Sequence, residues 1–292
     1  MAPEQQLRAY VDYLRDMGIY DLYHRDDPST HLPDALREKL SATTTAPAVA
    51  PRSAPSPVPA RPAPAPTQPP AVRAAPIDLM PKPPSFDSLA PLPAAPIAPE
   101  LRAAALATLR AEIGDCTRCP LAYAGRHTIV FADGAPNARL MFVGEGPGAD
   151  EDASGIPFVG KAGQLLNNMI AAMGLKREEV YIANIVKCRP PANRAPEFVE
   201  ATTCSQFLLR QIDIVRPEII VALGATAATY LLGVKQSLAS LRGQWHATRG
   251  AKVAVTYHPA FLLRDPRQKG EAWKDLQRVM AEMGLTPPRR AT

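Results

Sequence analysis

The sequence predicts an α/β fold, a three-layer sandwich with a central four-stranded parallel sheet, preceded by a disordered linker. Two observations predict it. Four short apolar runs alternate with segments of helical periodicity, the pattern of buried parallel strands joined by crossover helices. The composition also changes sharply along the chain, because eighteen of its 33 prolines fall between Ser41 and Glu100.

The proline-rich stretch divides the chain. Residues 41–100 are rich in Pro and Ala and hold few large apolar side chains, so burial cannot offset the entropy of ordering them. We therefore expect a disordered linker between an N-terminal helical segment, residues 1–40, and a folded domain, residues 101–287, with a tail at 288–292. The first segment has an apolar stripe, which favours a docking helix for a partner protein or a helix folded back on the domain. The stripe consists of Leu7, Tyr10, Val11, Leu14 and Met17.

The chain is modestly basic, with a net charge of +5 and a pI near 9.1. This charge suits a polyanionic partner such as DNA, although many basic proteins never bind nucleic acid. The sequence has no run of eighteen apolar residues and no charged-then-apolar signal pattern at its start. We therefore expect a cytoplasmic protein, associated with the nucleoid if its partner is DNA.

The predicted strands span residues 139–144, 180–186, 218–224 and 252–257. Each is short and bounded by polar residues or glycine, as strands covered on both faces should be. Helical spacing of apolar residues appears before Gly174 and again after Pro196. Strands and helices that alternate in this way imply right-handed crossovers, with ligands bound at the carboxyl ends of the strands.

Polar residues suited to chemistry follow three of these strands. Glu145 comes after the first strand, Asn184 ends the second, and His258 follows the fourth. An amide at the end of a buried strand is costly without a partner, so Asn184 is expected either to bond the backbone or to face a ligand. The three residues should therefore meet at one edge of the sheet.

The four cysteines indicate a metal centre. Cys116 and Cys119 form a C-x2-C pair, whereas Cys188 and Cys204 are separated by fifteen residues. Without an extracellular signal, four cysteines favour metal binding over disulfides, and both zinc and a [4Fe–4S] cluster accept four thiolates. Spacing alone leaves both metals open, as well as cysteines that are simply buried. A metal here would pin the first helix of the domain, in which we expect Cys116 and Cys119, to the segment after the second strand.

The loop after the first strand is the most informative segment. Residues 144–163 read GEGPGADEDASGIPFVGKAG. Its glycines allow a close backbone approach to a flat ligand, but the loop fits neither G-x-x-x-x-G-K-[ST] nor G-x-G-x-x-G, and its four acidic residues would repel phosphates. A nucleotide-phosphate loop is therefore not expected.

This loop resembles the first motif of the family-four uracil-DNA glycosylases, the iron–sulphur branch of that superfamily. The segments NIVKCRPPANRAPE, residues 184–197, and HPAFLLR, residues 258–264, resemble the second and third blocks of the family. The four cysteines fall where the cluster ligands of the family fall. The resemblance covers about residues 113–285.

The resemblance implies a uracil-DNA glycosylase-like fold, a [4Fe–4S] cluster on the four cysteines and a monomer that acts on uracil in single- or double-stranded DNA. Such an enzyme hydrolyses the N-glycosidic bond of flipped-out deoxyuridine and releases uracil for base excision repair. Two rival hypotheses are a uracil-DNA binder without turnover and a replication accessory module. Some relatives trap DNA through a histidine in an inserted loop after the second block, but Pro191–Pro196 contains no histidine.

The resemblance also assigns roles. Phe158 would stack on the pyrimidine, unless it is only core, and Asn184 would pair with O4 and N3–H of uracil. His258 would donate a hydrogen bond to O2, where negative charge develops. Glu145 is the first choice for the carboxylate that holds or activates the water molecule, and Glu151 is the alternative. Gly146 stands where the best-known uracil glycosylases have an Asp.

An apolar tip follows the HPA turn. Leu262 or Leu263 could fill the gap left by an extruded base, and Arg264 could meet a phosphate. The alternative is that these leucines pack the last helix.

Overall fold

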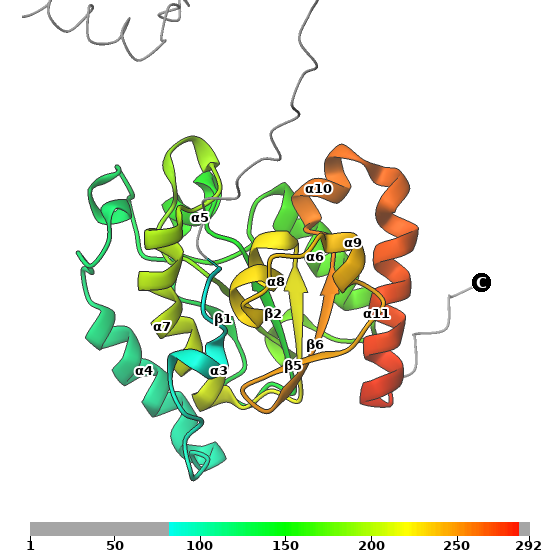
Figure 1. Cartoon of the computed structure of the whole chain (residues 1–292), viewed down its shortest axis with the longest axis horizontal. Helices are drawn as coiled ribbons and strands as arrows, with labels where there is room; N and C mark the ends of the chain where they lie inside the picture. Colours follow the sequence, from blue (N-terminus) through cyan, green and yellow to red (C-terminus); the bar gives the residue numbers. More distant parts are fainter. Residues whose placement is uncertain (1–81, 286–292) are drawn as a thin grey trace, which may run out of the picture. The chain divides into compact units, whose positions relative to one another are not determined.

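The computed structural model describes residues 82–285. The predicted N-terminal helical segment, most of the predicted linker and the tail at 288–292 lie outside the described residues. Figure 1 shows a sheet with helices on both faces. None of the helices between residues 82 and 285 has the length and apolar character that crossing a membrane requires.

The sheet has six strands in the described residues, not the four predicted. Their order is β1-β3-β2-β4-β6-β5. The central four strands are parallel, as predicted, while β1 and β5 pair antiparallel at the two edges. The edge strands are only two and three residues long, too short for a hydrophobic pattern to reveal them. The strands are β1 Asp133–Gly134, β2 Leu140–Gly144, β3 Tyr181–Asn184, β4 Ile219–Leu223, β5 His246–Thr248 and β6 Ala251–Thr256.

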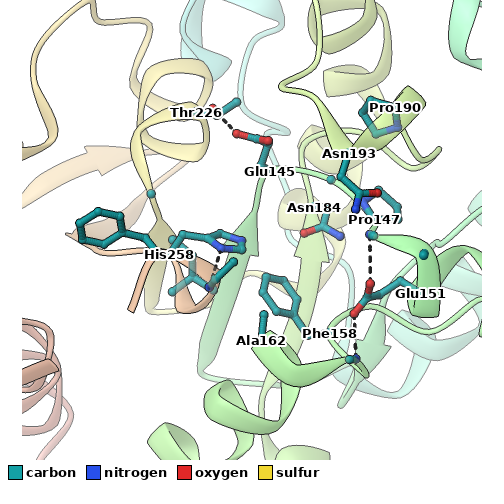
Figure 2. A pocket seen from close by; sticks show the side chains of 18 of the residues that line it. Glu145, Pro147, Glu151, Phe158, Ala162, Asn184, Pro190, Asn193, Thr226 and His258 are labelled. Carbon is teal, nitrogen blue, oxygen red and sulfur yellow. Dashed lines mark hydrogen bonds between the residues drawn. The ribbon is translucent and has the colours of Figure 1, made fainter. Parts of the chain in front are cut away.

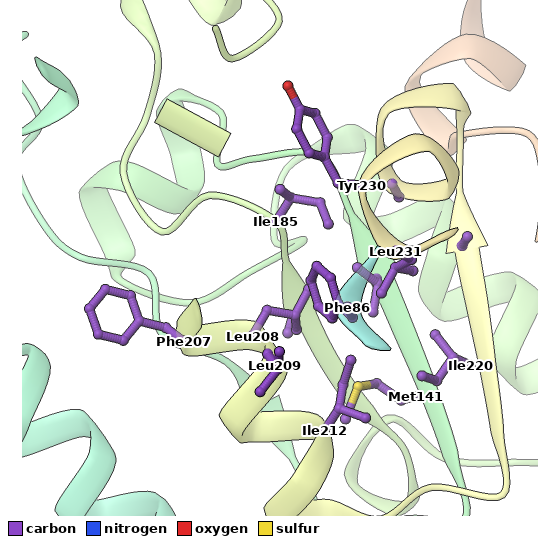
Figure 3. Close-up of a cluster of buried hydrophobic side chains, with 14 of the residues drawn as sticks. Phe86, Met141, Ile185, Phe207, Leu208, Leu209, Ile212, Ile220, Tyr230 and Leu231 are labelled. Carbon is purple, nitrogen blue, oxygen red and sulfur yellow. The ribbon is translucent and has the colours of Figure 1, made fainter. Parts of the chain in front are cut away.

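Two apolar layers separate the sheet from its helices. Because successive side chains of a strand point to opposite faces, Met141 and Val143 belong to one layer, and Leu140 and Phe142 to the other. The first layer packs against α3 Phe86–Leu89, α4 Arg102–Ile113, α7 Phe198–Val215 and α8 Ala225–Leu232 (Figure 3). The second packs against α6 Lys161–Ala172 and α11 Lys269–Met283. The three-layer sandwich is thus confirmed.

Shorter helices occupy the connections. The α-helical ones are α5 Ala149–Ser154, α9 Leu238–Leu241 and α10 Pro259–Arg264. The 3₁₀ turns are η2 Pro99–Leu101, η3 Pro120–Tyr123, η4 Arg177–Glu179, η5 Pro191–Asn193 and η6 Pro266–Gln268.

The folded part begins before Leu101, so the linker predicted for residues 41–100 extends too far. Phe86 on α3 is 0% exposed and belongs to the core in Figure 3. The backbone N–H of Arg249 donates to Asp87 at 2.7 Å, and the guanidinium of Arg249 forms an ion pair with Asp213 and bonds the carbonyl of Ala90. One buried aromatic side chain and one arginine therefore order a segment that its proline content assigned to the linker.

The order of the parallel strands creates a switch point between β2 and β4. The chain leaves β2 toward β3 on one side, then crosses through α7 to β4 on the other side of β2. Loops that leave neighbouring strands in opposite directions open a crevice at the carboxyl ends of those strands. The expected site should therefore lie beyond Gly144 and Leu223.

Candidate active site

A cavity of about 580 Å³ lies at this switch point. Its walls come from the loops that follow β2, β3, β4 and β6, and Figure 2 shows Phe158, Asn184 and His258 facing a common space. The cavity brings together all the residues expected to contact a base, which are Glu145, Gly146, Phe158, Asn184 and His258. Arg264 also reaches its wall.

Phe158 forms one wall in a constrained position. Its φ of 54° is left-handed, which a residue with an aromatic side chain rarely adopts. The ring is 5% exposed and lies against Gly144, where a Cβ atom would stand 2.5 Å from ring Cζ and 2.4 Å from Asn184 Oδ1. Only glycine at position 144 therefore allows the aromatic ring and the amide to occupy their places together.

Asn184 ends β3 with an unused acceptor. The residue is 2% exposed, and its Oδ1 atom has no hydrogen-bond partner among the described residues. A buried amide oxygen without a partner is destabilising, so an arrangement that keeps one is typical of a group that meets a ligand. Of the two alternatives for Asn184, the geometry favours the ligand-facing one.

His258 presents a defined tautomer to the cavity. It caps the N-terminus of α10, where its Nδ1 accepts from the backbone N–H of Ala260 at 3.1 Å. Since Nδ1 is an acceptor, the proton of the neutral ring is on Nε2. Burial, reinforced by the charge of Arg264, lowers the pKa of His258 to about 4, although Glu151 acts in the opposite direction. The ring is thus a neutral donor near pH 7, at a ring-centre distance of 5.5 Å from Phe158.

The two candidate carboxylates differ in how their oxygens are used. Glu145 Oε2 accepts from the hydroxyl of Thr226 at 2.5 Å (Figure 2). Glu151 is committed to the backbone, because its Oε1 accepts from the N–H groups of Val159 and Gly160 at 2.9 and 3.1 Å, and its Oε2 from that of Gly148 at 3.0 Å. Glu145 therefore has an oxygen available for water, whereas Glu151 fixes the loop.

Thr226 and Asn193 are among the residues of the cavity wall that sequence reasoning missed. Thr226 follows β4, and the rule about carboxyl ends of strands could have identified it. Asn193 lies in η5 with a φ of 55°, next to Ala192 with a φ of 52°, and its Oδ1 accepts from Arg189 Nε at 2.7 Å. No simple sequence signal marks such a pair of left-handed residues without glycine.

The apolar tip after the HPA turn divides into two environments. Leu262 is 1% exposed and packs inside the domain, so the expectation that it could enter DNA does not fit its position. Leu263 is 43% exposed. A helix turns by about 100° per residue, so neighbours on α10 face different sides.

The four cysteines line a second, small cavity together with Ile113 and Phe207. Cys116 and Cys119 lie after α4, which ends at Ile113, and not inside the first helix as predicted, because Gly114 terminates that helix. Cys188 follows β3, and Cys204 lies within α7 as expected. All four are free thiols.

Donor groups of two basic residues lie beside two of these thiols. Arg126 Nη1 lies 3.5 Å from Cys188 Sγ, and the backbone N–H of Lys187 donates to Cys204 Sγ at 3.3 Å. The buried ammonium of Lys187 also donates to the carbonyl of Asn184 at 3.0 Å. Burial raises the pKa of Cys188 to about 11 and that of Cys204 to about 12, so these thiols ionise only with a compensating cation.

The donor set fits a metal centre held by four thiolates, because all four cysteines line one cavity. Both a zinc ion and a [4Fe–4S] cluster accept four thiolates, so this lining fits either.

Fold and site together define an α/β protein with a cavity at the carboxyl edge of a parallel sheet, lined by an aromatic side chain, an amide and a neutral histidine. Comparison with known proteins agrees. Residues 131–277 match the family model described as the uracil DNA glycosylase superfamily.

Curated relatives narrow this assignment. The chain is 48% identical to a type-4 uracil-DNA glycosylase of Thermotoga maritima over 158 residues. The aligned region covers 53% of this chain and 81% of that protein. The type-4 uracil-DNA glycosylase of Sulfurisphaera tokodaii is 40% identical, over 63% of this chain and 87% of that protein. The type-4 enzyme of Pyrobaculum aerophilum is 42% identical, over 59% of this chain and 91% of that protein. The chain belongs to the uracil-DNA glycosylase superfamily and, within it, to the type-4 branch.

Proposed function

We propose that this chain is a uracil-DNA glycosylase that hydrolyses the N-glycosidic bond of flipped-out deoxyuridine in DNA. The observation that carries the proposal is the Oδ1 atom of Asn184, which has no hydrogen-bond partner within residues 82–285 and lies in one cavity with the ring of Phe158 and the donor of His258. The relatives named above support the same activity, since each is a type-4 uracil-DNA glycosylase.

Selection of uracil would rest on Asn184 and Phe158. The free Oδ1 acceptor requires a donor, which N3–H of uracil supplies, and the amide nitrogen can donate to O4. Cytosine has an acceptor at N3 and an amino group at C4, so both contacts would be lost and a buried oxygen would stay unpaired. Phe158 would stack on the ring, a contact of about 1–3 kcal/mol per base.

Bond cleavage would use His258 and Glu145. As the C1′–N1 bond breaks, its electron pair moves into the uracil ring and charge accumulates on O2, where the Nε2–H of His258 can donate. A water molecule then forms a bond to C1′ and gives a proton to Glu145, whose second oxygen Thr226 engages. Gly146 allows the loop that carries Glu145 to lie against Val186, because a Cβ at position 146 would stand only 2.7 Å from Val186 Cγ2.

The four cysteines would hold a [4Fe–4S] cluster. Such a cluster supplies a rigid cross-link between the turn after α4, the segment after β3 and α7. Arg126 and Lys187 would offset its thiolate charge. The substrate would be uracil-containing DNA, and the exposed Leu263 and Arg264 beside the cavity are suited to the base gap and a phosphate.

One assay tests the activity. The holoprotein is incubated with a labelled oligonucleotide containing one uracil, the product is treated with alkali, and strand breaks are counted. Wild type should break the strand at uracil, Glu145→Ala and His258→Ala should lose most activity, and Arg139→Ala, a surface variant at the other end of β2, should match wild type. Intact DNA with folded wild-type protein would leave only the binding and accessory hypotheses. Absorbance at about 400 nm in the same protein would separate an iron–sulphur cluster from zinc.

A further inference from the structure

The turn that carries Phe158 is strained and tightly enclosed. Besides its left-handed φ of 54°, the residue has Gly163 against its carbonyl group, where a Cβ would lie 1.9 Å from the oxygen. A residue stays in such a conformation only when its surroundings over-determine it. The N–H groups that follow Phe158 are held by Glu151, so the question is what holds the carbonyl groups.

Arg177 holds them. Its Nη2 donates to the carbonyl of Pro157 at 2.6 Å, and its Nη1 to the carbonyl of Phe158 at 3.1 Å. The guanidinium is itself fixed by Asn167 Oδ1 at 2.8 Å and by an ion pair of its Nε with Asp133 at 2.7 Å. It is 21% exposed and lies outside the cavity wall.

This arrangement requires an arginine. The guanidinium is planar and offers donors in a fixed fork, so it can bind two successive carbonyl groups while two other acceptors hold it in place. A lysine has one rotatable ammonium and cannot reproduce the fork. Without the fork, the Pro157 and Phe158 carbonyl groups lose their shared donor, and the turn can relax toward an ordinary negative φ.

Relaxation of the turn would move the aromatic ring. The ring lies between Gly144 and the ring of His258 and forms the face on which a base would stack. A change in φ at Phe158 rotates that face relative to Asn184, so stacking and amide pairing could no longer be made together.

We propose that Arg177 is a positioning residue for uracil, which acts through the backbone of Phe158 without touching the substrate. The inference rests on the proposed function. It differs from a purely structural role of Arg177, in which the ion pair with Asp133 on the edge strand β1 would stabilise the domain but leave uracil affinity alone.

A double-mutant cycle separates the two roles. Arg177→Ala and Arg177→Lys are made in the wild type and in a Phe158→Ala background, with Arg139→Ala as the matched control, because Arg139 pairs bidentately with Glu218 on the surface. For each holoprotein, KM and kcat on single-stranded uracil DNA, the inhibition constant of free uracil, and thermal unfolding are measured.

Arg177→Ala should raise KM and the inhibition constant of uracil about tenfold, within the range expected for a lost stacking contact. Arg177→Lys should recover only part of this loss. In the Phe158→Ala background the same substitutions should change the inhibition constant less than about twofold, because the group through which Arg177 acts is gone. Arg139→Ala should alter neither constant.

Equal effects in both backgrounds, or a lowered unfolding temperature with unchanged uracil inhibition, would overturn the proposal. If Arg177→Ala does not fold, Asn167→Ala removes one of the contacts that fix the guanidinium and should give a smaller increase with the same dependence on Phe158. If the wild-type protein releases no uracil, the proposed function is refuted. If the wild type is active and Arg177→Ala leaves the inhibition constant of uracil unchanged, only this inference is refuted.

Discussion

The protonation state of His258 gives the most specific prediction. A histidine with its ordinary pKa of about 6.5 is about three-quarters protonated at pH 6, whereas one with a pKa of about 4 is protonated to only about 1%. Protonation would place a second proton on Nδ1, which already accepts from the N–H of Ala260, so the cap of α10 would break. The donor to uracil O2 should therefore be neutral throughout the physiological range.

The same shift makes stability depend on pH. Between pH 4 and 6.5 the unfolded chain binds more protons at this histidine than the folded chain does, so the free energy of unfolding rises with pH. The contribution is fully present above about pH 6.5 and is lost as the pH falls toward 4. A shift of this size corresponds to about 3 kcal/mol, at 1.36 kcal/mol per pKa unit.

NMR of ¹⁵N-histidine-labelled holoprotein checks both statements. The His258 signal, assigned by its absence in His258→Gln, should show the Nε2–H tautomer and should not titrate between pH 5.5 and 8. In denaturant unfolding over the same range, wild type should lose more stability toward pH 5.5 than His258→Gln. A titration midpoint near 6.5 or above, or a proton on Nδ1 at pH 7, would refute the reasoning.

Three further predictions concern other parts of the site. Thr226→Val should lower kcat about tenfold with little change in KM, because Glu145 loses the hydroxyl that orients it. Steady-state kinetics checks this, and a raised KM with unchanged kcat would mean that Thr226 only binds substrate. Leu262→Ala should lower the free energy of unfolding by about 2–5 kcal/mol, whereas Leu263→Ala should change it by less than about 0.5 kcal/mol. Leu263→Ala should also weaken activity on duplex DNA more than on single strands. Equal stabilities of the two variants would contradict the assigned packing. Cys204→Ser should remove the absorbance at about 400 nm, and its retention would exclude Cys204 as a ligand.

Much of the architecture could be predicted because strong local signals agreed with one another. The four parallel strands are short, buried on both faces and separated by helices, so the hydrophobic pattern located each within about two residues. The rule that ligands bind at the carboxyl ends of the strands then predicted that Glu145, Asn184 and His258 would meet, whereas the strand order, and with it the switch point, was visible only in the structure. Motif resemblance supplied Phe158, which no strand rule would have selected.

What escaped prediction depends on single long-range contacts. Arg177 is nineteen positions from Phe158, and nothing in the residues around it indicates that its side chain returns to that turn. Phe86 is one aromatic residue among prolines, so the averaged composition hid its burial. Leu262 and Leu263 are chemically alike, and only the rotation of α10 decides which of them faces solvent. Glu145 and Glu151 could be separated only once their hydrogen bonds were visible.

The bond between Lys187 and Asn184 has a consequence for how the protein would respond to iron. Cys188 follows Asn184, the residue proposed to pair with the base, by four positions, and Lys187 between them contacts both the carbonyl of Asn184 and Cys204. Withdrawing iron from the proposed cluster would therefore loosen the peptide that positions the Asn184 amide. The absorbance of the protein and its discrimination between bases should therefore decrease together during chelation. The colour of a preparation would then indicate how much of the protein is able to select its base.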